Sequence, residues 1–262
     1  MSKKKNNSKQ TAQLVLEDGK ILEGFLFGYH KSTAGEVVFN TGMVGYPETL
    51  TDPSYTGQIL VMTYPLVGNY GVPGMSVTNN LADNFESDKI QIQALIVSEE
   101  SEAFSHWNSV ESLDEWLKRY RIPGLYGIDT RYLTKILRER GTMLGKIEMG
   151  KDKVKFYDPD VVDLIAQVTP AKTEVYGSGK KRIMLVDCGC KKSILTNLLE
   201  RNVSVVRVPY NHNFDKEDYD GVLLSNGPGN PAVYKKLVES TKSLIKKQVP
   251  ILGICMGHQI LA

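Results

Sequence analysis

The chain has 262 residues, of which 41% are hydrophobic and 24% are charged, and its formal net charge is +2. That length suffices for one large or two ordinary domains, each with a core of its own. No apolar run approaches the length that crosses a bilayer, and the N-terminus lacks the apolar segment of a secretory signal. Three cysteines suit a reducing compartment better than a disulfide framework. We therefore expect a cytoplasmic protein.

The N-terminus is basic, with four lysines in the first ten residues, and without them the rest of the chain is slightly acidic. Such a tail can contact nucleic acid or a membrane surface, but a solvated, disordered end is commoner. We predict a disordered tail over residues 1–10 and no nucleic-acid or membrane partner.

Residues 11–150 contain short apolar runs separated by glycine and proline, a pattern typical of strands. The expected strands cover residues 14–16, 36–39, 58–63, 91–97 and 142–147. Two helices interrupt them. One begins at the capping box formed by Ser112 and Glu115, and the other begins near Asp129 and ends at Gly141. This half is predicted to be a mainly-β α+β domain.

Residues 151–181 are polar and are predicted to form a linker with one short helix over 159–166. From residue 182 onward, strands alternate with helices. Strands are expected at 183–186, 203–208, 221–224 and 250–254, and helices at 191–201, at 233–245 and from near 257. This alternation predicts an α/β domain over 182–262 with a doubly wound parallel sheet, whose ligands would lie beyond the carboxyl ends of the strands.

The segment Gly253-Ile254-Cys255-Met256-Gly257 has the form of a nucleophile elbow with cysteine in the serine position. Glycines two residues before and after the nucleophile leave room for a strained turn between strand and helix. The start of a helix favours a thiolate, and the next N–H group points to where an oxyanion would form. Because free cysteines are often simply buried, the alternative is a structural role. We predict Cys255 to be a nucleophile.

The loop Asn226-Gly227-Pro228-Gly229 also follows a predicted strand. It is either a plain tight turn or a loop whose exposed N–H groups supply a second oxyanion donor and a wall for a small amide substrate. The C-x-C pair Cys188 and Cys190 has no further ligands nearby, so no metal site is predicted there.

A cysteine nucleophile needs a base, and the chain has four histidines. His258 follows Cys255 by three residues on the same predicted helix, which turns it away from the tip of the elbow. We predict a packing or hydrogen-bonding role for it. The other three have no carboxylate in an H-x-E or H-x-D arrangement, so the catalytic set is incomplete.

Two sets of motifs resemble known families. Residues 224–231 and 253–259 resemble the class I glutamine amidotransferases. The N-terminal half resembles the small chain of carbamoyl phosphate synthetase, and the motifs that carry this resemblance cover residues 35–43, 45–48, 50–55, 63–69, 127–131 and 168–170.

This resemblance implies that Cys255 attacks the carboxamide of L-glutamine and releases ammonia through a glutamyl thioester. The ammonia would pass to a large synthetase subunit, where bound ATP and Mg²⁺ serve the formation of carbamoyl phosphate from bicarbonate, a product used for arginine or pyrimidine synthesis. No cofactor is expected on this chain. The N–H groups of Gly227 and Met256 would form the oxyanion hole. The residues implied to contact glutamine are Ser54, Gly227, Gly229, Met256 and Gln259.

In this family the base is a histidine in an H-x-E arrangement well after the cysteine, and the sequence ends at Ala262. We therefore expect an incomplete amidotransferase domain and little glutaminase activity from these residues alone. Two further hypotheses remain: a chain that only docks the large subunit without chemistry, and a cysteine hydrolase that is unconnected to glutamine.

Overall fold

The computed structural model describes residues 10–78, 81–214 and 218–262, so the predicted tail lies outside the described residues except for its last position. Contacts divide the chain into two compact units. The first unit consists of Met1–Pro47, Gln58–Gly74 and Ile92–Asp158, and the second consists of Glu48–Gly57, Met75–Gln91 and Pro159–Ala262. Two segments of the N-terminal half, one of which carries Ser54, thus belong to the second unit.

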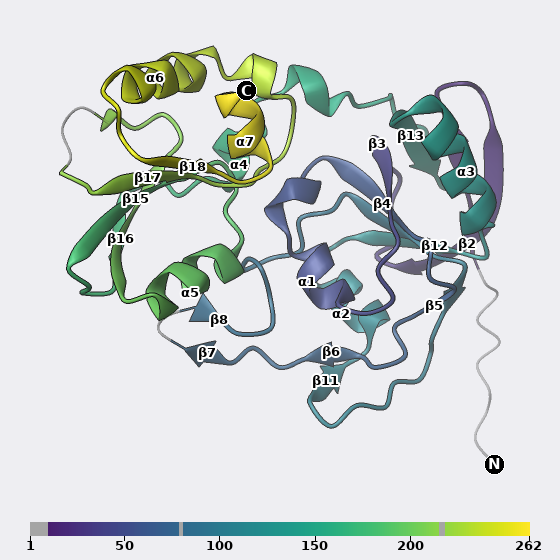
Figure 1. Ribbon diagram of the computed structural model, residues 1–262. Helices are drawn as coiled ribbons and strands as arrows, with labels where there is room; N and C mark the ends of the chain where they lie inside the picture. Colours follow the sequence, from purple (N-terminus) through teal and green to yellow (C-terminus); the bar gives the residue numbers. More distant parts are fainter. Residues whose placement is uncertain (1–9, 79–80, 215–217) are drawn as a thin grey trace. The chain divides into compact units, whose positions relative to one another are not determined.

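The first unit is built on a closed barrel with the strand order β1-β13-β3-β4-β9-β12-β2, drawn in purple, blue and teal in Figure 1. Strands β3, β4, β9 and β12 run parallel to one another, and the remaining neighbours are antiparallel. Strand β1 shows why the barrel closes, since Ala12, Leu14 and Leu16 alternate with more exposed residues and fill the interior. The strands are β1 (Thr11–Leu16), β2 (Ile21–Gly28), β3 (Thr33–Asn40), β4 (Gln58–Met62), β9 (Ala94–Ile96), β12 (Pro123–Tyr126) and β13 (Met143–Glu148).

Helices α2 (Leu113–Arg119) and α3 (Thr130–Arg140) belong to this unit, and both confirm the sequence prediction. The capping box of α2 is complete, because Ser112 Oγ accepts the Glu115 N–H while the Glu115 carboxylate accepts the Ser112 N–H. Short strand pairs join β5 (Leu66–Val67) to β10 (Glu99–Glu100) and β6 (Val72–Pro73) to β11 (Ser109–Glu111).

Replacing Ser112 by alanine is expected to lower the free energy of unfolding by about 1 kcal/mol, the usual effect of losing an N-cap acceptor. Ser105→Ala is the matched control. Ser105 is exposed and caps no helix, and its N–H donates to the Asn69 backbone oxygen. Denaturant unfolding of both variants checks the prediction. Equal stability of the two variants would show that the capping box contributes nothing.

Strands β2 and β12 were not predicted from the sequence. Strand β12 opens with Pro123-Gly124, a pair that favours a turn, yet it lies in the barrel between β2 and β9. The proline is tolerated because it occupies the first position of the strand.

The second unit contains a sheet with the order β14-β16-β15-β17-β18. Strands β16, β15, β17 and β18 are parallel, as predicted, and β14 is antiparallel to β16. The order reverses at β15, so the carboxyl ends of β15 and β17 flank the point where such sheets bind ligands. The strands are β14 (Glu174–Tyr176), β15 (Lys181–Asp187), β16 (Val203–Pro209), β17 (Gly221–Leu224) and β18 (Ile251–Gly253).

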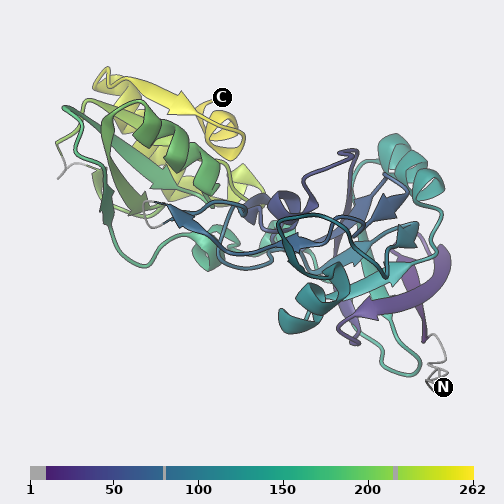
Figure 2. The ribbon, with the colours of Figure 1, turned by 90° about the horizontal axis from the view of Figure 1, so that it is seen from below.

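Helices cover both faces of this sheet. Helix α5 (Lys192–Glu200) packs on the face that carries Leu185, Val205 and Leu223. Helices α6 (Lys235–Lys246) and α7 (Met256–Leu261) pack on the opposite face. Figure 1 shows α6 and α5 on either side of the strands, and in Figure 2, seen from below, α5 lies on the near side. The doubly wound arrangement is confirmed.

The predicted linker is more structured than expected. Residues 174–176 form β14 and extend the sheet, and the single predicted helix is a 3-10 turn at Pro159–Val161 followed by α4 (Ile165–Val168). Across the described ranges, every helix is too short or too polar to span a lipid bilayer.

Two segments of the second unit, Glu48–Gly57 and Met75–Gln91, help to cap helix α5. The side chain of its own N-cap residue, Lys191, makes no capping hydrogen bond. The backbone oxygen and the carboxylate of Glu86 accept the N–H groups of Lys192 and Ser193 at 3.0 and 2.9 Å. Thr51 Oγ1 in turn accepts the Glu86 N–H at 2.9 Å, so the strand-to-helix turn after β15 is tied to the segment that carries Ser54. The same segments contain α1 (Tyr46–Leu50), which begins in the first unit, and the pair β7 (Val77–Thr78) and β8 (Leu81–Ala82).

Candidate active site

Cys255 stands at the turn between β18 and α7, in the strand-turn-helix context that the sequence predicted. Its backbone has φ +51° and ψ −109°, a region that residues other than glycine rarely adopt. The residue is exposed, unlike the buried Cys188 and Cys190. The Gly257 N–H donates to both Ile254 and Ser225 oxygens at 3.0 Å, which holds the bend closed. The geometry is that of a nucleophile elbow.

The two glycines of the elbow have no room for a side chain. A Cβ atom on Gly253 would lie 2.5 Å from the backbone of Gly257, and one on Gly257 would lie 2.2 Å from the oxygen of Leu224. Gly253 thus lets α7 lie close to β18, and Gly257 lets it lie close to the end of β17, so the elbow depends on both glycines.

The loop after β17 lies against this elbow. Ser225 links three segments, because its oxygen accepts the Gly257 N–H while its Oγ accepts the Cys188 N–H at 2.9 Å. A Cβ atom on Gly227 would lie 1.9 Å from the Cys188 oxygen. The loops after β15 and β17 and the elbow after β18 therefore form one packed cluster at the carboxyl ends of the strands.

Ser54 joins this cluster from the 3-10 helix at Pro53–Tyr55. Asp52 accepts the Ser54 N–H at 2.9 Å, and Ser54 Oγ accepts a hydrogen bond from Asn226 Nδ2 at 2.9 Å. Asp52 also pairs with Lys191, with 2.6 Å between the carboxylate and Nζ. Only the family resemblance pointed to Ser54, and sequence reasoning missed Asp52 and Lys191, whose partners are distant along the chain.

The charges of the cluster are fixed by their neighbours. Burial lowers the pKa of Lys191, but the hydrogen bond and the charge of Asp52 outweigh it, so the net shift is upward and the lysine stays positive. Burial, followed by the Asp187 carboxylate, raises the pKa of the Cys188 and Cys190 thiols, which keeps both protonated. Among the described residues, no group of three or more His, Cys, Asp or Glu side chains is arranged to hold a metal ion.

The other site residues predicted from the sequence lie on the loop after β17 and on α7. Met256 is the first residue of α7, with a buried side chain, and Gln259 is exposed one turn after Cys255, its N–H donating to the Cys255 oxygen at 3.0 Å. Gly229 is exposed with φ +84°. His258 is exposed as well, so the packing role is wrong, and the hydrogen-bonding role offered beside it stays a prediction.

Comparison with known proteins covers both halves of the chain. Residues 14–147 match the family described as "Carbamoyl-phosphate synthase small chain, CPSase domain", and residues 184–262 match "Glutamine amidotransferase class-I". The carbamoyl phosphate synthase small chain of Sulfurisphaera tokodaii is 48% identical over 94% of this chain and 68% of its own length.

Longer relatives contain the same region. The human mitochondrial "Carbamoyl-phosphate synthase [ammonia]" is 44% identical and the "Multifunctional protein CAD" of Squalus acanthias is 48% identical, each over 96% of this chain. The chain spans only 17% and 12% of their lengths. A solved aminopeptidase from Aneurinibacillus covers 95% of this chain and 71% of its own, but with 9% identity and a TM-score of 0.29 it has no bearing on fold or function.

The matches to both halves and the S. tokodaii relative agree with the elbow, the glycine loop and the doubly wound sheet described above. The chain belongs to the carbamoyl phosphate synthase small chain family and carries a class I glutamine amidotransferase region after its N-terminal barrel.

Proposed function

We propose that this chain provides the glutamine-hydrolysing site of a carbamoyl phosphate synthetase, with Cys255 as the nucleophile. The thiolate attacks the carboxamide carbon of L-glutamine, the C–N bond breaks, and the nitrogen takes up a proton and leaves as ammonia. Water then cleaves the thioester, which gives glutamate and the free thiolate.

The backbone of Cys255 is the observation that carries this proposal. A cysteine with φ +51° is strained, and such strain persists where the surrounding structure holds it, commonly at functional sites. The side chain is also exposed at the start of α7, where a substrate can reach it. A cysteine retained only for packing needs neither feature.

The N–H groups of Gly227 and Met256 are proposed to form the oxyanion hole. Met256 opens α7, and the first N–H groups of a helix have no acceptor within it. In the part of the chain that the structure describes, neither N–H donates to a protein atom. Two preorganised donors of this kind stabilise the tetrahedral intermediate of an acyl transfer.

Ser54, Gly227, Gly229, Met256 and Gln259 are proposed to contact glutamine. Ser54 Oγ already accepts a hydrogen bond from Asn226, which leaves its own O–H free to donate to a substrate oxygen. Because the glycines of the loop carry no side chain, a flat carboxamide can approach their backbone.

The ammonia is proposed to pass to a large synthetase subunit, which would bind ATP and Mg²⁺ and form carbamoyl phosphate from bicarbonate. The relatives support this pairing, since the chain matches one part of longer carbamoyl phosphate synthases and of multifunctional proteins. No cofactor is proposed on this chain. Three free cysteines suit a reducing location such as the cytoplasm.

The alternative is a chain that docks the synthetase subunit without chemistry of its own. A relative whose name specifies ammonia fits that alternative, because a synthase supplied with ammonia needs no glutaminase. The strained, exposed Cys255 favours glutamine hydrolysis instead.

Covalent labelling tests the proposal. A diazoketone analogue of glutamine should label Cys255 alone, located by mass spectrometry, and L-glutamine but not L-asparagine should protect it. Cys188 and Cys190 serve as internal controls, since both are buried and held protonated. Labelling that glutamine fails to prevent would favour a cysteine hydrolase of another specificity, and absence of labelling would favour the docking module.

A further inference from the structure

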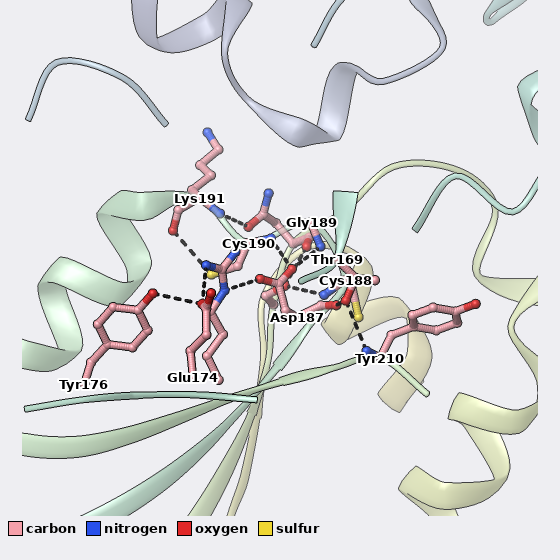
Figure 3. Close-up of polar contacts among 12 residues, drawn as sticks. Thr169, Glu174, Tyr176, Asp187, Cys188, Gly189, Cys190, Lys191 and Tyr210 are labelled. Atoms are coloured by element: carbon pink, nitrogen blue, oxygen red, sulfur yellow. Dashed lines mark hydrogen bonds and ion pairs between the residues drawn. The ribbon is translucent and has the colours of Figure 1, made fainter. Parts of the chain in front are cut away.

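An ion pair between the buried Asp187 and the largely buried Arg207 lies beside the proposed site but outside the residues assigned to it. Asp187, at the end of β15, is fully buried, and Arg207 Nε on β16 donates to its Oδ2 at 2.5 Å. Arg207 Nη1 also donates to Glu174 Oε2 at 3.0 Å, and the Tyr176 hydroxyl donates to the same carboxylate oxygen at 2.9 Å. Figure 3 shows Asp187 at the centre of these contacts, with Glu174 and Tyr176 on one side.

A buried ion pair is a weak source of stability, because taking two charges out of water offsets most of their attraction. Burial lowers the pKa of Arg207, but the charge and hydrogen bond of Asp187 outweigh it and the net shift is upward, so the guanidinium stays charged. A hydrophobic pair could join β15 to β16 equally well. The pair therefore calls for an explanation beyond joining two strands.

The second carboxylate oxygen of Asp187 supplies this explanation. Asp187 Oδ1 accepts the N–H groups of Gly189 and Cys190 at 2.7 and 2.8 Å, and so shapes the turn that follows β15. Its backbone oxygen accepts the Thr169 hydroxyl at 2.8 Å. Arg207 fixes one carboxylate oxygen while the other fixes the turn.

The turn after β15 orients the side chain of Asn226. The N–H of Lys191, the next residue of the turn, donates to Asn226 Oδ1 at 3.0 Å. An amide carries its oxygen and its NH₂ group on opposite sides, so this bond directs Nδ2 toward Ser54 Oγ, 2.9 Å away. A path of hydrogen bonds, joined through the backbone between Cys190 and Lys191, thus runs from Arg207 to Ser54 and to Asn226, the residue that precedes Gly227.

We propose that Arg207 and Asp187 are positioning residues of the glutamine site, which act through the turn and the Asn226 amide to set Ser54 and the glycine loop. This inference rests on the proposed glutaminase function. The proposed role concerns the arrangement of the site. Arg207 and Asp187 do not contact glutamine themselves, and they determine how tightly glutamine is held, not how reactive the Cys255 sulfur is.

The test compares two reactions of Cys255 in the assembled enzyme. One is labelling by iodoacetamide, which reports the intrinsic reactivity of the thiolate. The other is labelling by the diazoketone, with the glutamine concentration that gives half protection. Arg207→Lys retains a positive charge beside Asp187 but cannot bond to Asp187 and Glu174 together. It should raise the half-protecting glutamine concentration about fivefold, which corresponds to a coupling of about 1 kcal/mol, and leave the iodoacetamide rate unchanged.

The route through Asn226 is tested by combining variants. Asn226→Ala should raise the half-protecting concentration by itself, and adding Arg207→Lys to it should have no further effect. Lys181→Met is the matched control, because it removes an exposed ion pair with Asp220 at the opposite end of β15 from Asp187 and should change neither reaction. If Arg207→Lys fails to fold, Glu174→Ala removes the second partner of Arg207 and should shift protection in the same direction.

The outcomes separate this inference from the proposed function. Glutamine protection that is normal in the Arg207→Lys and Glu174→Ala variants, or effects of Arg207→Lys and Asn226→Ala that simply add, would overturn the positioning role and leave the glutaminase intact. Loss of both reactions together in a folded variant would also overturn it, since a general distortion would then explain the result. Failure of glutamine to protect the unsubstituted chain would instead reject the proposed function itself.

Discussion

Replacing Cys255 by alanine is expected to reduce glutamine-dependent carbamoyl phosphate formation by about a thousandfold or more, the scale at which removal of a nucleophile acts. In the proposed reaction, no thioester forms and no ammonia is released without the sulfur. Carbamoyl phosphate formation from added ammonium salt should be unchanged, because that route bypasses the proposed glutaminase site. Both rates are measured in the assembled enzyme by trapping the product.

The substitution should leave the fold intact. The Cys255 side chain is exposed, so alanine removes little packing, and its backbone strain is already borne by the cysteine. His258→Ala is the matched control, since this residue is exposed on the same helix and has no proposed part in the reaction. Equal loss with glutamine and with ammonia would point to a structural role for Cys255, and full glutamine-dependent activity would remove the basis of the proposal.

The parts of the fold predicted from sequence are those that local patterns determine. The capping box at Ser112 and the alternation of strands and helices after residue 182 depend on neighbours a few residues apart, and the structure has both. Strand β12 was missed because its Pro-Gly opening signals a turn, while pairing with β2 and β9 decides the outcome. Strand β14 was missed because its three residues lie in a polar segment and become a strand only beside β16.

The candidate site also has one part that local sequence predicts and another part that depends on distant partners. The elbow at Cys255 was predictable because its glycine spacing and its strand-to-helix context are local. Ser54 and Arg207 were not predictable from spacing, because Asn226 and Asp187, their partners, lie far along the chain. One signal was present: Arg207 is a lone charge within a run of valines, and Asp187 closes an apolar strand. Charged residues at such positions need partners, which only the parallel pairing of β15 with β16 identifies.

Gly257→Ala is expected to destabilise the second unit by about 3 kcal/mol, at the upper end of what overpacking usually costs. Helix propensity alone predicts the opposite, a gain of about 1 kcal/mol for alanine over glycine inside a helix. Packing should outweigh propensity, because the added Cβ would lie 2.2 Å from the Leu224 oxygen and 2.6 Å from its carbonyl carbon. Both are backbone atoms at the end of a buried strand, so neither can rotate away.

Denaturant unfolding and the rate of Cys255 labelling measure the two consequences of this clash. The variant should unfold at lower denaturant, and the diazoketone should label it more slowly, because α7 can relieve the overlap only by moving away from β17 and opening the bend at Cys255. Gly74→Ala is the matched control, since its nearest neighbour is a valine methyl at 3.4 Å, and it should change neither quantity. A Gly257→Ala chain that is more stable than the original would mean that helix propensity prevails here and that the elbow does not need its second glycine.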